Sequence, residues 1–273
     1  MIDPSEDLKA MIEAAKTAGA GLERHFAQLA HLTVRSKTGP ADMVSIADEE
    51  AEVTARGILA RAQPSYAFLG EEGGIGGGDD QSQQWIVDPL DGTTNFLRGI
   101  PHFAVSIACK YRGRLEHAVI VDPVRQEEFT ASRGRGAQLN GRRLRVSSRT
   151  SLEGALLGTG FPFRDGQMAD MDNYLGMLRA LTGQTAGIRR AGSASLDLAY
   201  VAAGRFDAFW ESGLSEWDMA AGVLLIQEAG GLVSDFNGGH DFLDKGHIVA
   251  GNIKCFKAVL TAIQPHLPES MKR

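Results

Sequence analysis

The chain has 273 residues, of which 43% are hydrophobic and 23% are charged, so it can bury a large core in one or two domains. Its formal net charge of −6 argues against a general nucleic-acid or membrane surface, because such surfaces attract an excess of basic residues. It contains no apolar run long enough to span a membrane, and its acidic start, Met1–Asp7, lacks the basic and apolar regions of a signal peptide. We therefore expect a globular, cytoplasmic protein.

The first part of the chain predicts two helices and two extended segments. Apolar residues recur every three or four positions from Ser5 to Leu32, which is typical of a long amphipathic helix. The extended piece Thr33–Lys37 follows, and a second helix is expected to end near Arg61. Tyr66–Leu69 then predicts a strand, which leads directly into the acids of Gly70–Glu72.

Residues 73 to 78 read Gly-Gly-Ile-Gly-Gly-Gly and invite comparison with a nucleotide-binding loop. The run lacks the Gly-Lys-Ser/Thr ending of a P-loop, and dinucleotide spacing would need glycine where Asp79 stands. We instead expect a flexible connection between two strands that could move over a neighbouring site.

The least ordinary stretch is Trp85–Phe96, which reads Trp-Ile-Val-Asp-Pro-Leu-Asp-Gly-Thr-Thr-Asn-Phe. Trp85–Val87 predicts a short buried strand that ends at Asp88-Pro89, so Asp88 and Asp91 lie near the carboxyl end of a strand. Neighbouring carboxylates repel each other unless cations lie among them, and sites with only oxygen ligands favour hard metals such as Mg²⁺. Free amides at a helix start after Gly92 would also hold phosphate oxygens. For this stretch alone, an ordinary pair of turns remains an alternative.

An antiparallel meander and a hairpin are expected next. Strands are predicted at residues 103–110, 115–121 and 128–131, and Asn140-Gly141 is a strong signal for a hairpin turn. Arg142, Arg143 and Arg145 follow that turn and alternate with apolar residues, as on an edge strand with one solvated face. Solvation of this face explains the arginines more simply than a phosphate-binding patch does.

From about residue 150 the pattern changes to alternating strands and helices, which is typical of an α/β fold. This change predicts two halves, residues 1–147 and 148–273. In the second half we expect strands at 155–157, 187–190, 206–210, 232–234 and 247–250, and helices at 168–181, 194–203, 218–229 and 253–263. Asp218 lies at a helix start, where it is either an N-cap or a fourth carboxylate beside Glu71, Asp88 and Asp91.

Three motifs together resemble the signatures of one family. Gly70–Glu72, Trp85–Phe96 and Trp217–Gly222 are similar, in order and spacing, to motifs of the inositol monophosphatase family, within the lithium-sensitive, Mg²⁺-dependent phosphatase superfamily. The resemblance implies an α+β or α/β fold, a layered αβαβα sandwich of the inositol monophosphatase and fructose-bisphosphatase type. It also implies a metal site between the two halves, a homodimer and inhibition by lithium.

The resemblance further implies a role for individual residues. Two or three Mg²⁺ ions would be held by Glu71, Asp88, the Leu90 carbonyl, Asp91 and Asp218. The residues expected to act on the attacking water, directly or from nearby, are Glu71, Thr93, Asp48 and Lys37. The substrate would be held by the Gly92 and Thr93 amides at the phosphate, and by Gly192, Ser193, Ala194 and Glu211 at the alcohol. For Ser193, capping of a helix is a sufficient explanation by itself.

The motif ending Thr94-Asn95-Phe96 favours the inositol branch of the superfamily. The predicted function is therefore hydrolysis of a small polyol phosphate, with myo-inositol 1-phosphate as the first choice, by a metal-activated water. Histidinol phosphate, fructose 1,6-bisphosphate and adenosine 3′,5′-bisphosphate remain alternative substrates. A regulatory protein that keeps the scaffold and docks on nucleic-acid machinery through Arg142, Arg143 and Arg145 is the alternative from another class.

Overall fold

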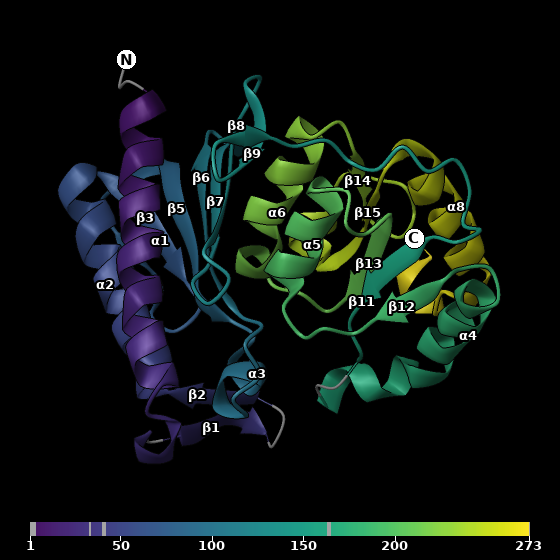
Figure 1. The fold of residues 1–273 in the computed structure, drawn as a ribbon, viewed down its shortest axis with the longest axis horizontal. Coiled ribbons are helices and arrows are strands. Elements are labelled where there is room, and N and C mark those ends of the chain that lie inside the picture. Colours follow the sequence, from purple (N-terminus) through teal and green to yellow (C-terminus); the bar gives the residue numbers. More distant parts are fainter. Residues whose placement is uncertain (1–3, 33, 40–41, 163–164, 273) are drawn as a thin grey trace.

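The elements of the computed structural model, which describes residues 4–32, 34–39, 42–162 and 165–272, are stacked in five layers (Figure 1). Helices α1 (Pro4–Phe26) and α2 (Ile46–Ala62) cover one face of the first sheet. Helices α5 (Ala194–Ala202) and α6 (Glu216–Glu228) lie between the two sheets, and α4 (Met171–Thr182) and α8 (Ile253–Ile263) lie on the far side of the second sheet. The predicted αβαβα sandwich is confirmed.

The first sheet has eight strands in the described residues, in the order β10-β9-β8-β7-β6-β5-β3-β4. The strands are β3 (Tyr66–Gly70), β4 (Gly74–Gly77), β5 (Asp80–Asp91), β6 (Ala104–Tyr111), β7 (Arg114–Asp122), β8 (Glu127–Ser132), β9 (Gly136–Leu139) and β10 (Arg142–Arg143). Strands β3 and β5 pair in parallel, and the pairs from β5 to β10 are antiparallel. The predicted meander and the hairpin at Asn140-Gly141 are therefore confirmed.

The prediction of a flexible connection at residues 73–78 is wrong, because Gly74–Gly77 forms the edge strand β4 and pairs with β3. A Cβ added to Gly77 would lie 2.8 Å from the Tyr66 carbonyl oxygen, and one added to Gly78 would lie 2.3 Å from the same atom of Ser65. The glycines thus allow one backbone to approach another closely, which is a different use of glycine from flexibility.

The predicted end of a strand at Asp88-Pro89 is also wrong. Strand β5 continues to Asp91, and its register against β6 shifts between Asp88 and Asp91. Proline is tolerated at such an irregularity because the ladder does not need its missing N–H there. A further difference is a small separate sheet of β1 (Val34–Gly39) and β2 (Asp42–Ser45), of which only the first strand was expected.

The second sheet has five strands in the described residues, in the order β12-β11-β13-β15-β14. The strands are β11 (Leu156–Thr159), β12 (Gly187–Arg189), β13 (Ala208–Ser212), β14 (Leu232–Ser234) and β15 (His247–Gly251). The remaining helices are α3 (Thr93–Leu97) and α7 (Phe242–Lys245), with 3₁₀ turns at Leu29–His31, Asp165–Asp170, Gln264–His266 and Glu269–Met271. Each strand and long helix predicted after residue 150 is present within a few residues, whereas α7 was not predicted.

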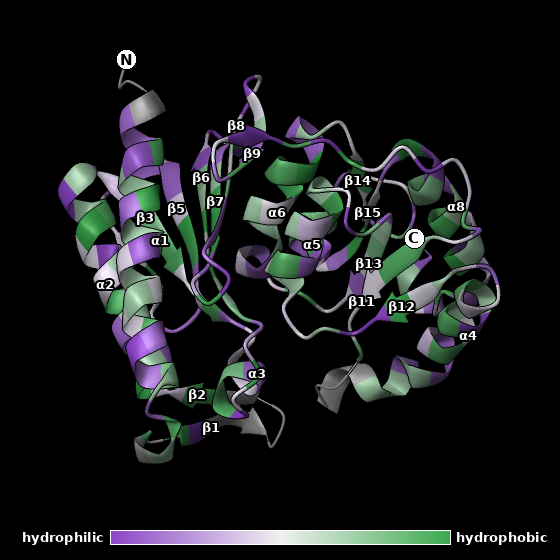
Figure 2. Cartoon of the chain, viewed as in Figure 1, coloured by the Kyte–Doolittle hydropathy of each residue, from purple (hydrophilic) through white to green (hydrophobic). Residues whose placement is uncertain are grey.

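The middle helix layer shares one hydrophobic core with both sheets. Leu198 of α5 and Leu224 of α6 belong to the same buried cluster as Phe129 of the first sheet and Ile248 of the second. Hydrophobic residues run along the strands of both sheets, whereas α1 alternates hydrophilic and hydrophobic residues (Figure 2). Because this core crosses residue 148, the division into residues 1–147 and 148–273 stays a prediction. Among the described residues, no helix combines the length and apolar character needed to cross a membrane.

Close contact of α5 with α6 predicts a stability effect. A Cβ added to Gly222 would lie 2.4 Å from the Leu198 Cβ, so Gly222→Ala is expected to lower the free energy of unfolding by about 1–3 kcal/mol. Gly57→Ala on α2 is the matched control, because its nearest neighbour is the Arg61 side chain at 3.7 Å and alanine favours helix. Urea denaturation of both variants tests this, and a Gly222→Ala protein as stable as wild type would contradict the tight contact.

Candidate active site

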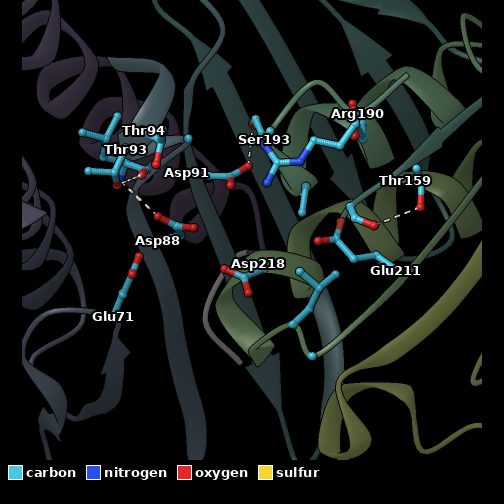
Figure 3. Close-up of a pocket in the computed structure, with 18 of the residues that line it drawn as sticks. Glu71, Asp88, Asp91, Thr93, Thr94, Thr159, Arg190, Ser193, Glu211 and Asp218 are labelled. Atoms are coloured by element: carbon cyan, nitrogen blue, oxygen red, sulfur yellow. Dashed lines mark hydrogen bonds between the residues drawn. The ribbon is translucent and has the colours of Figure 1, made fainter. Parts of the chain in front are cut away.

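One pocket lies between the two sheets and is lined by both halves of the chain (Figure 3). It encloses about 910 Å³, which includes solvent space at its open mouth. From the first half it is lined by Glu71, Asp88, Leu90, Asp91, Gly92, Thr93 and Thr94. From the second half it is lined by Thr159, Gly160, Arg190, Gly192, Ser193, Ala194, Asp197, Glu211, Ser212, Gly213, Leu214 and Asp218. All the predicted site residues except Asp48 and Lys37 thus line this one pocket.

Parallel pairing of β3 with β5 brings the first acids together. Gly70 pairs with Val87, and the Glu71 amide donates a hydrogen bond of 3.2 Å to the Val87 carbonyl oxygen. Because both strands run in the same direction, Glu71 and Asp88 leave them at the same end of the sheet. Asp91 follows after the irregularity in β5 and also faces the pocket.

Gly92 makes the turn from β5 into α3 with a φ of 101°, in the left-handed region that favours glycine. A Cβ there would lie 3.0 Å from the His102 carbonyl oxygen and 3.3 Å from that of Gly192. Asn95 joins the halves at this point, since its side-chain amide donates to the carbonyl oxygens of His102, at 2.8 Å, and Ala191, at 2.9 Å. The phosphate-binding turn predicted at Gly92 therefore lies against the start of α5.

Asp91 is bound to the start of α5. Its Oδ2 accepts hydrogen bonds from the Ser193 hydroxyl at 2.6 Å, from the Ser195 amide at 2.7 Å and from the Ser195 hydroxyl. Ser193 also caps the helix by accepting from the Leu196 amide at 3.4 Å, so the cap explanation and a place in the pocket both hold. Ser195 was missed by the sequence analysis, and only its spacing of two residues from Ser193 could have indicated it.

Asp218 is in the first turn of α6, but it is not the N-cap. Ser215 takes that position, and its amide donates to the Asp218 Oδ2 at 2.6 Å in a capping box. The start of α6 is attached to β6 of the first sheet by an ion pair between Lys110 and Glu216. The N-cap alternative for Asp218 is therefore wrong, and the helix start that carries Asp218 is tied to the half that carries Asp88 and Asp91.

Helix α2 holds Thr93 through Asp48, which is buried below the pocket. The Thr93 hydroxyl lies 3.0 Å from the Asp48 Oδ1 and 3.1 Å from the Leu90 carbonyl oxygen, and it can donate its hydrogen to either. The other Asp48 oxygen accepts from the Ser45 amide at 2.9 Å and from the Ser45 hydroxyl at 2.7 Å. Asp48, which was expected near the attacking water, therefore contacts Thr93 directly. Lys37 is in β1, and its side chain lies outside the described residues.

The same face of α2 also holds the turn that carries Glu71. Glu52 lies one helical turn after Asp48, is 5% exposed, and accepts hydrogen bonds from the amides of Glu72 at 2.8 Å and Gly73 at 2.7 Å. A Cβ on Gly70 would lie 2.4 Å from a Glu52 oxygen, and one on Gly73 would lie 2.5 Å from the other. Glu52 was not predicted, although its spacing of four residues from Asp48 is a signal for a shared helix face.

Burial and mutual repulsion dominate the electrostatics of the acids. The pKa of Asp88 is raised well above its usual value, first by burial and then by the negative charges of Glu71, Asp91 and Asp218. Burial also raises the pKa of Asp91, although its serine hydrogen bonds oppose this, and it raises the pKa of Asp48. The carboxylates at this end of the pocket therefore repel one another when they are ionised.

The chemistry of these donors fits a hard divalent cation, since they are carboxylate and carbonyl oxygens that repel one another. Their arrangement is less compact than a coordination sphere. Within the described ranges, no group of three or more His, Cys, Asp or Glu side chains has the geometry to hold a metal ion. Asp91 and Asp218 are each directed to serine donors at a helix start, at Ser195 and Ser215 respectively.

The model of the inositol monophosphatase family matches residues 3–269. The chain belongs to the inositol monophosphatase family. The resemblance inferred from the three motifs is thus confirmed, and phosphatases of this family are generally metal-dependent.

Relatives of known name and structure are similar over nearly their whole length. Nus factor SuhB of Pseudomonas aeruginosa is 68% identical over 97% of this chain and 98% of its own. Inositol-1-monophosphatase of Rhizobium meliloti is 52% identical over 96% of this chain and 97% of its own. The crystal structure of extragenic suppressor protein suhB from Bartonella henselae, at 47% identity, matches with a TM-score of 0.91 over 95% of this chain and 98% of that one.

The repulsion of Asp88 by the neighbouring carboxylates predicts that Asp88→Asn stabilises the folded protein when a chelator keeps metal ions out of the site. Because the pKa of Asp88 is raised on folding, its charged form destabilises the folded state above that pKa, and this effect vanishes below the pKa of the unfolded chain. We expect the melting temperature to rise by roughly 2 °C or more near pH 8, with the gain disappearing toward about pH 4. Asp172→Asn on the exposed face of α4 is the control. If the difference in melting temperature between Asp88→Asn and wild type grows as the pH falls, this account is contradicted.

Proposed function

We propose that the protein is a Mg²⁺-dependent phosphomonoesterase of a small polyol phosphate, with myo-inositol 1-phosphate as the first substrate. The observation that carries the proposal is the pocket between the sheets, which has the Glu71, Asp88, Asp91 and Asp218 carboxylates at one end and the Arg190 and Glu211 side chains at the other. The relative from Rhizobium meliloti named inositol-1-monophosphatase, at 52% identity, supports the choice of substrate. A homodimer and inhibition by lithium follow from the family resemblance and belong to the same proposal.

Glu71, Asp88, the Leu90 carbonyl, Asp91 and Asp218 would hold the metal ions, as their oxygen chemistry allows. When bound, two or three Mg²⁺ ions would neutralise the acids, clamp the phosphate and lower the pKa of a water molecule. Asp91 and Asp218 would hold metal ions while hydrogen bonds from the starts of α5 and α6 position their carboxylates.

The residues around Thr93 supply the orientation of the attacking water. The Thr93 hydroxyl directs its hydrogen to Asp48 or to the Leu90 carbonyl, and its oxygen is left to accept a hydrogen bond from that water. Glu71 accepts the other proton of the water and acts as the general base while the water oxygen bonds to phosphorus. The P–O bond to the alcohol breaks in the same displacement, and the leaving oxygen takes up a proton from solvent. The amides of Gly92 and Thr93 in the first turn of α3 donate to phosphate oxygens, as is usual where a helix begins.

The second half of the chain holds the alcohol. Gly192, Ser193 and Ala194 form the wall at the start of α5, and the Glu211 carboxylate accepts hydrogen bonds from the substrate hydroxyls. A Cβ on Gly160 would lie 1.8 Å from a Glu211 oxygen, so glycine at this position makes the space in which that carboxylate lies. Glu211 is thereby directed into the pocket from the end of β13.

A regulatory binding role is the second candidate. Nus factor SuhB of Pseudomonas aeruginosa, at 68% identity, has a name that points to nucleic-acid machinery. Arg142 and Arg143 are exposed on β10, the edge strand of the first sheet, and Arg145 is exposed beside it. Charged residues also protect edge strands from pairing with other chains, so this surface is compatible with either role.

The proposed function predicts phosphate release that depends on magnesium. Myo-inositol 1-phosphate is expected to be hydrolysed faster than fructose 1,6-bisphosphate, histidinol phosphate and adenosine 3′,5′-bisphosphate, and Asp91→Asn is expected to lower kcat/KM by about a hundredfold or more. The measurement is release of inorganic phosphate from these four esters with and without Mg²⁺.

Each outcome separates the candidates. Hydrolysis that is indifferent to magnesium, or unaffected by Asp91→Asn, would overturn the mechanism. Preference for another ester of the panel would keep the mechanism and change the substrate. Binding of a phosphate ester without turnover would favour the regulatory role.

Glu52 predicts an effect on metal affinity. Because Glu52 holds the turn that follows Glu71, Glu52→Gln is expected to raise the Mg²⁺ concentration for half-maximal activity by about tenfold, with a smaller effect on kcat at saturating Mg²⁺. Glu50→Gln is the matched control on the same helix, because Glu50 is exposed and contacts His25 at the surface. An equal shift in both variants would show that Glu52 has no special place in the site.

A further inference from the structure

Asp197 is a buried carboxyl group in the pocket that the mechanism above does not use. It lines the pocket from α5 and is 1% exposed, and its Oδ1 has no hydrogen-bond partner among the described residues. Burying a polar group without a hydrogen bond destabilises a fold by about 1–3 kcal/mol. A residue of this kind at the wall of a pocket indicates a group that is satisfied by a ligand.

Helix α5 directs Asp197 into the alcohol end of the pocket. Asp197 is four residues after Ser193, and its amide donates to the Ser193 carbonyl oxygen at 3.0 Å, so the two side chains lie on one face of the helix. Ser193 is the N-cap of α5 and contacts Asp91, whereas Asp197 lies one turn farther along the buried helix. The pair therefore spans from the acidic end of the pocket toward Glu211.

The charges around Asp197 favour a neutral ligand. Burial raises the pKa of the Asp197 carboxyl well above its usual value, and the nearby charges of Glu211 and Asp91 raise it further, while Arg190 opposes the shift. The Arg190 guanidinium lines the same part of the pocket and disfavours a second cation beside it. A carboxyl group with one unpartnered buried oxygen, next to a second carboxylate and a guanidinium, is well matched to the hydroxyl groups of a polyol.

We propose that Asp197 is a specificity-determining residue, whose side chain shares a hydrogen bond with a ring hydroxyl of the substrate and so selects polyol phosphates over esters that lack that hydroxyl. This inference rests on the proposed function, and it adds a second carboxyl group to Glu211 at the alcohol end. Together the two side chains distinguish a polyhydroxylated ring from an apolar ring of the same size. The energy lost when such a buried group is left unpaired is what gives hydrogen-bonding sites their discrimination.

The test uses two esters that differ only in ring hydroxyls, myo-inositol 1-phosphate and cyclohexyl phosphate, with the full-length protein in Mg²⁺. Asp197→Ala is expected to lower kcat/KM for myo-inositol 1-phosphate by about tenfold relative to cyclohexyl phosphate, which is the loss of one hydrogen bond. Asp197→Asn keeps a carbonyl oxygen in the same shape and is expected to recover most of the discrimination. Asp172→Ala, which removes an exposed acid of α4, is the control, and thermal unfolding of each variant verifies the fold.

Each result decides the matter. The assignment would be overturned if Asp197→Ala leaves kcat/KM unchanged for both esters, or lowers kcat/KM for both by the same factor. If wild type hydrolyses neither ester, the proposed function fails, and calorimetric titration of the same esters in Mg²⁺ replaces the rates. In that case, if Asp197→Ala binds myo-inositol 1-phosphate more weakly than wild type does but binds cyclohexyl phosphate equally well, the role of Asp197 is supported. If both proteins bind myo-inositol 1-phosphate with equal affinity, the role is rejected.

Discussion

Repulsion among carboxylates that come from distant parts of the chain is the constraint on which this structure depends. Asp88 is almost fully buried, and Glu71, Asp91 and Asp218 raise its pKa because their charges lie near it. A fold tolerates such a group only if surrounding elements hold the acids in place against their repulsion. Much of the polar structure between the two sheets can be understood as that support.

The support comes from three directions. Helix α2 holds the first half of the site, with Asp48 bound to Thr93 and Glu52 bound to the turn after Glu71. The start of α5 holds Asp91 through Ser193 and Ser195. The start of α6 holds Asp218 in a capping box and is tied to the first sheet by the ion pair of Lys110 with Glu216. Rigid helices rather than loops thus carry most of the positioning, which suits a site that needs fixed distances.

Sequence reasoning predicted the meander and most helices, because these follow from periodicity and from local spacing. The layers and the roles of the motif residues were implied by the family resemblance that the three motifs carry. It missed Ser195 and Glu52 because their importance arises from contacts with residues far away along the chain. The Ser195 amide meets Asp91 across 104 positions, and no local pattern marks that distance. The glycine run at residues 73–78 was misjudged for the same reason, since its closeness to the backbone of β3 is visible only in three dimensions.

Helices α5 and α6 are buried between the sheets, and in α6 the run from Met219 to Ile226 is buried without interruption. The first sheet packs against these helices, yet its own strands end by residue 143, some fifty positions before α5 begins. During synthesis on the ribosome, that sheet must therefore wait with one apolar face uncovered until the chain has grown past residue 226. Partly made chains thus expose apolar surface that the finished fold covers, and such surface favours aggregation.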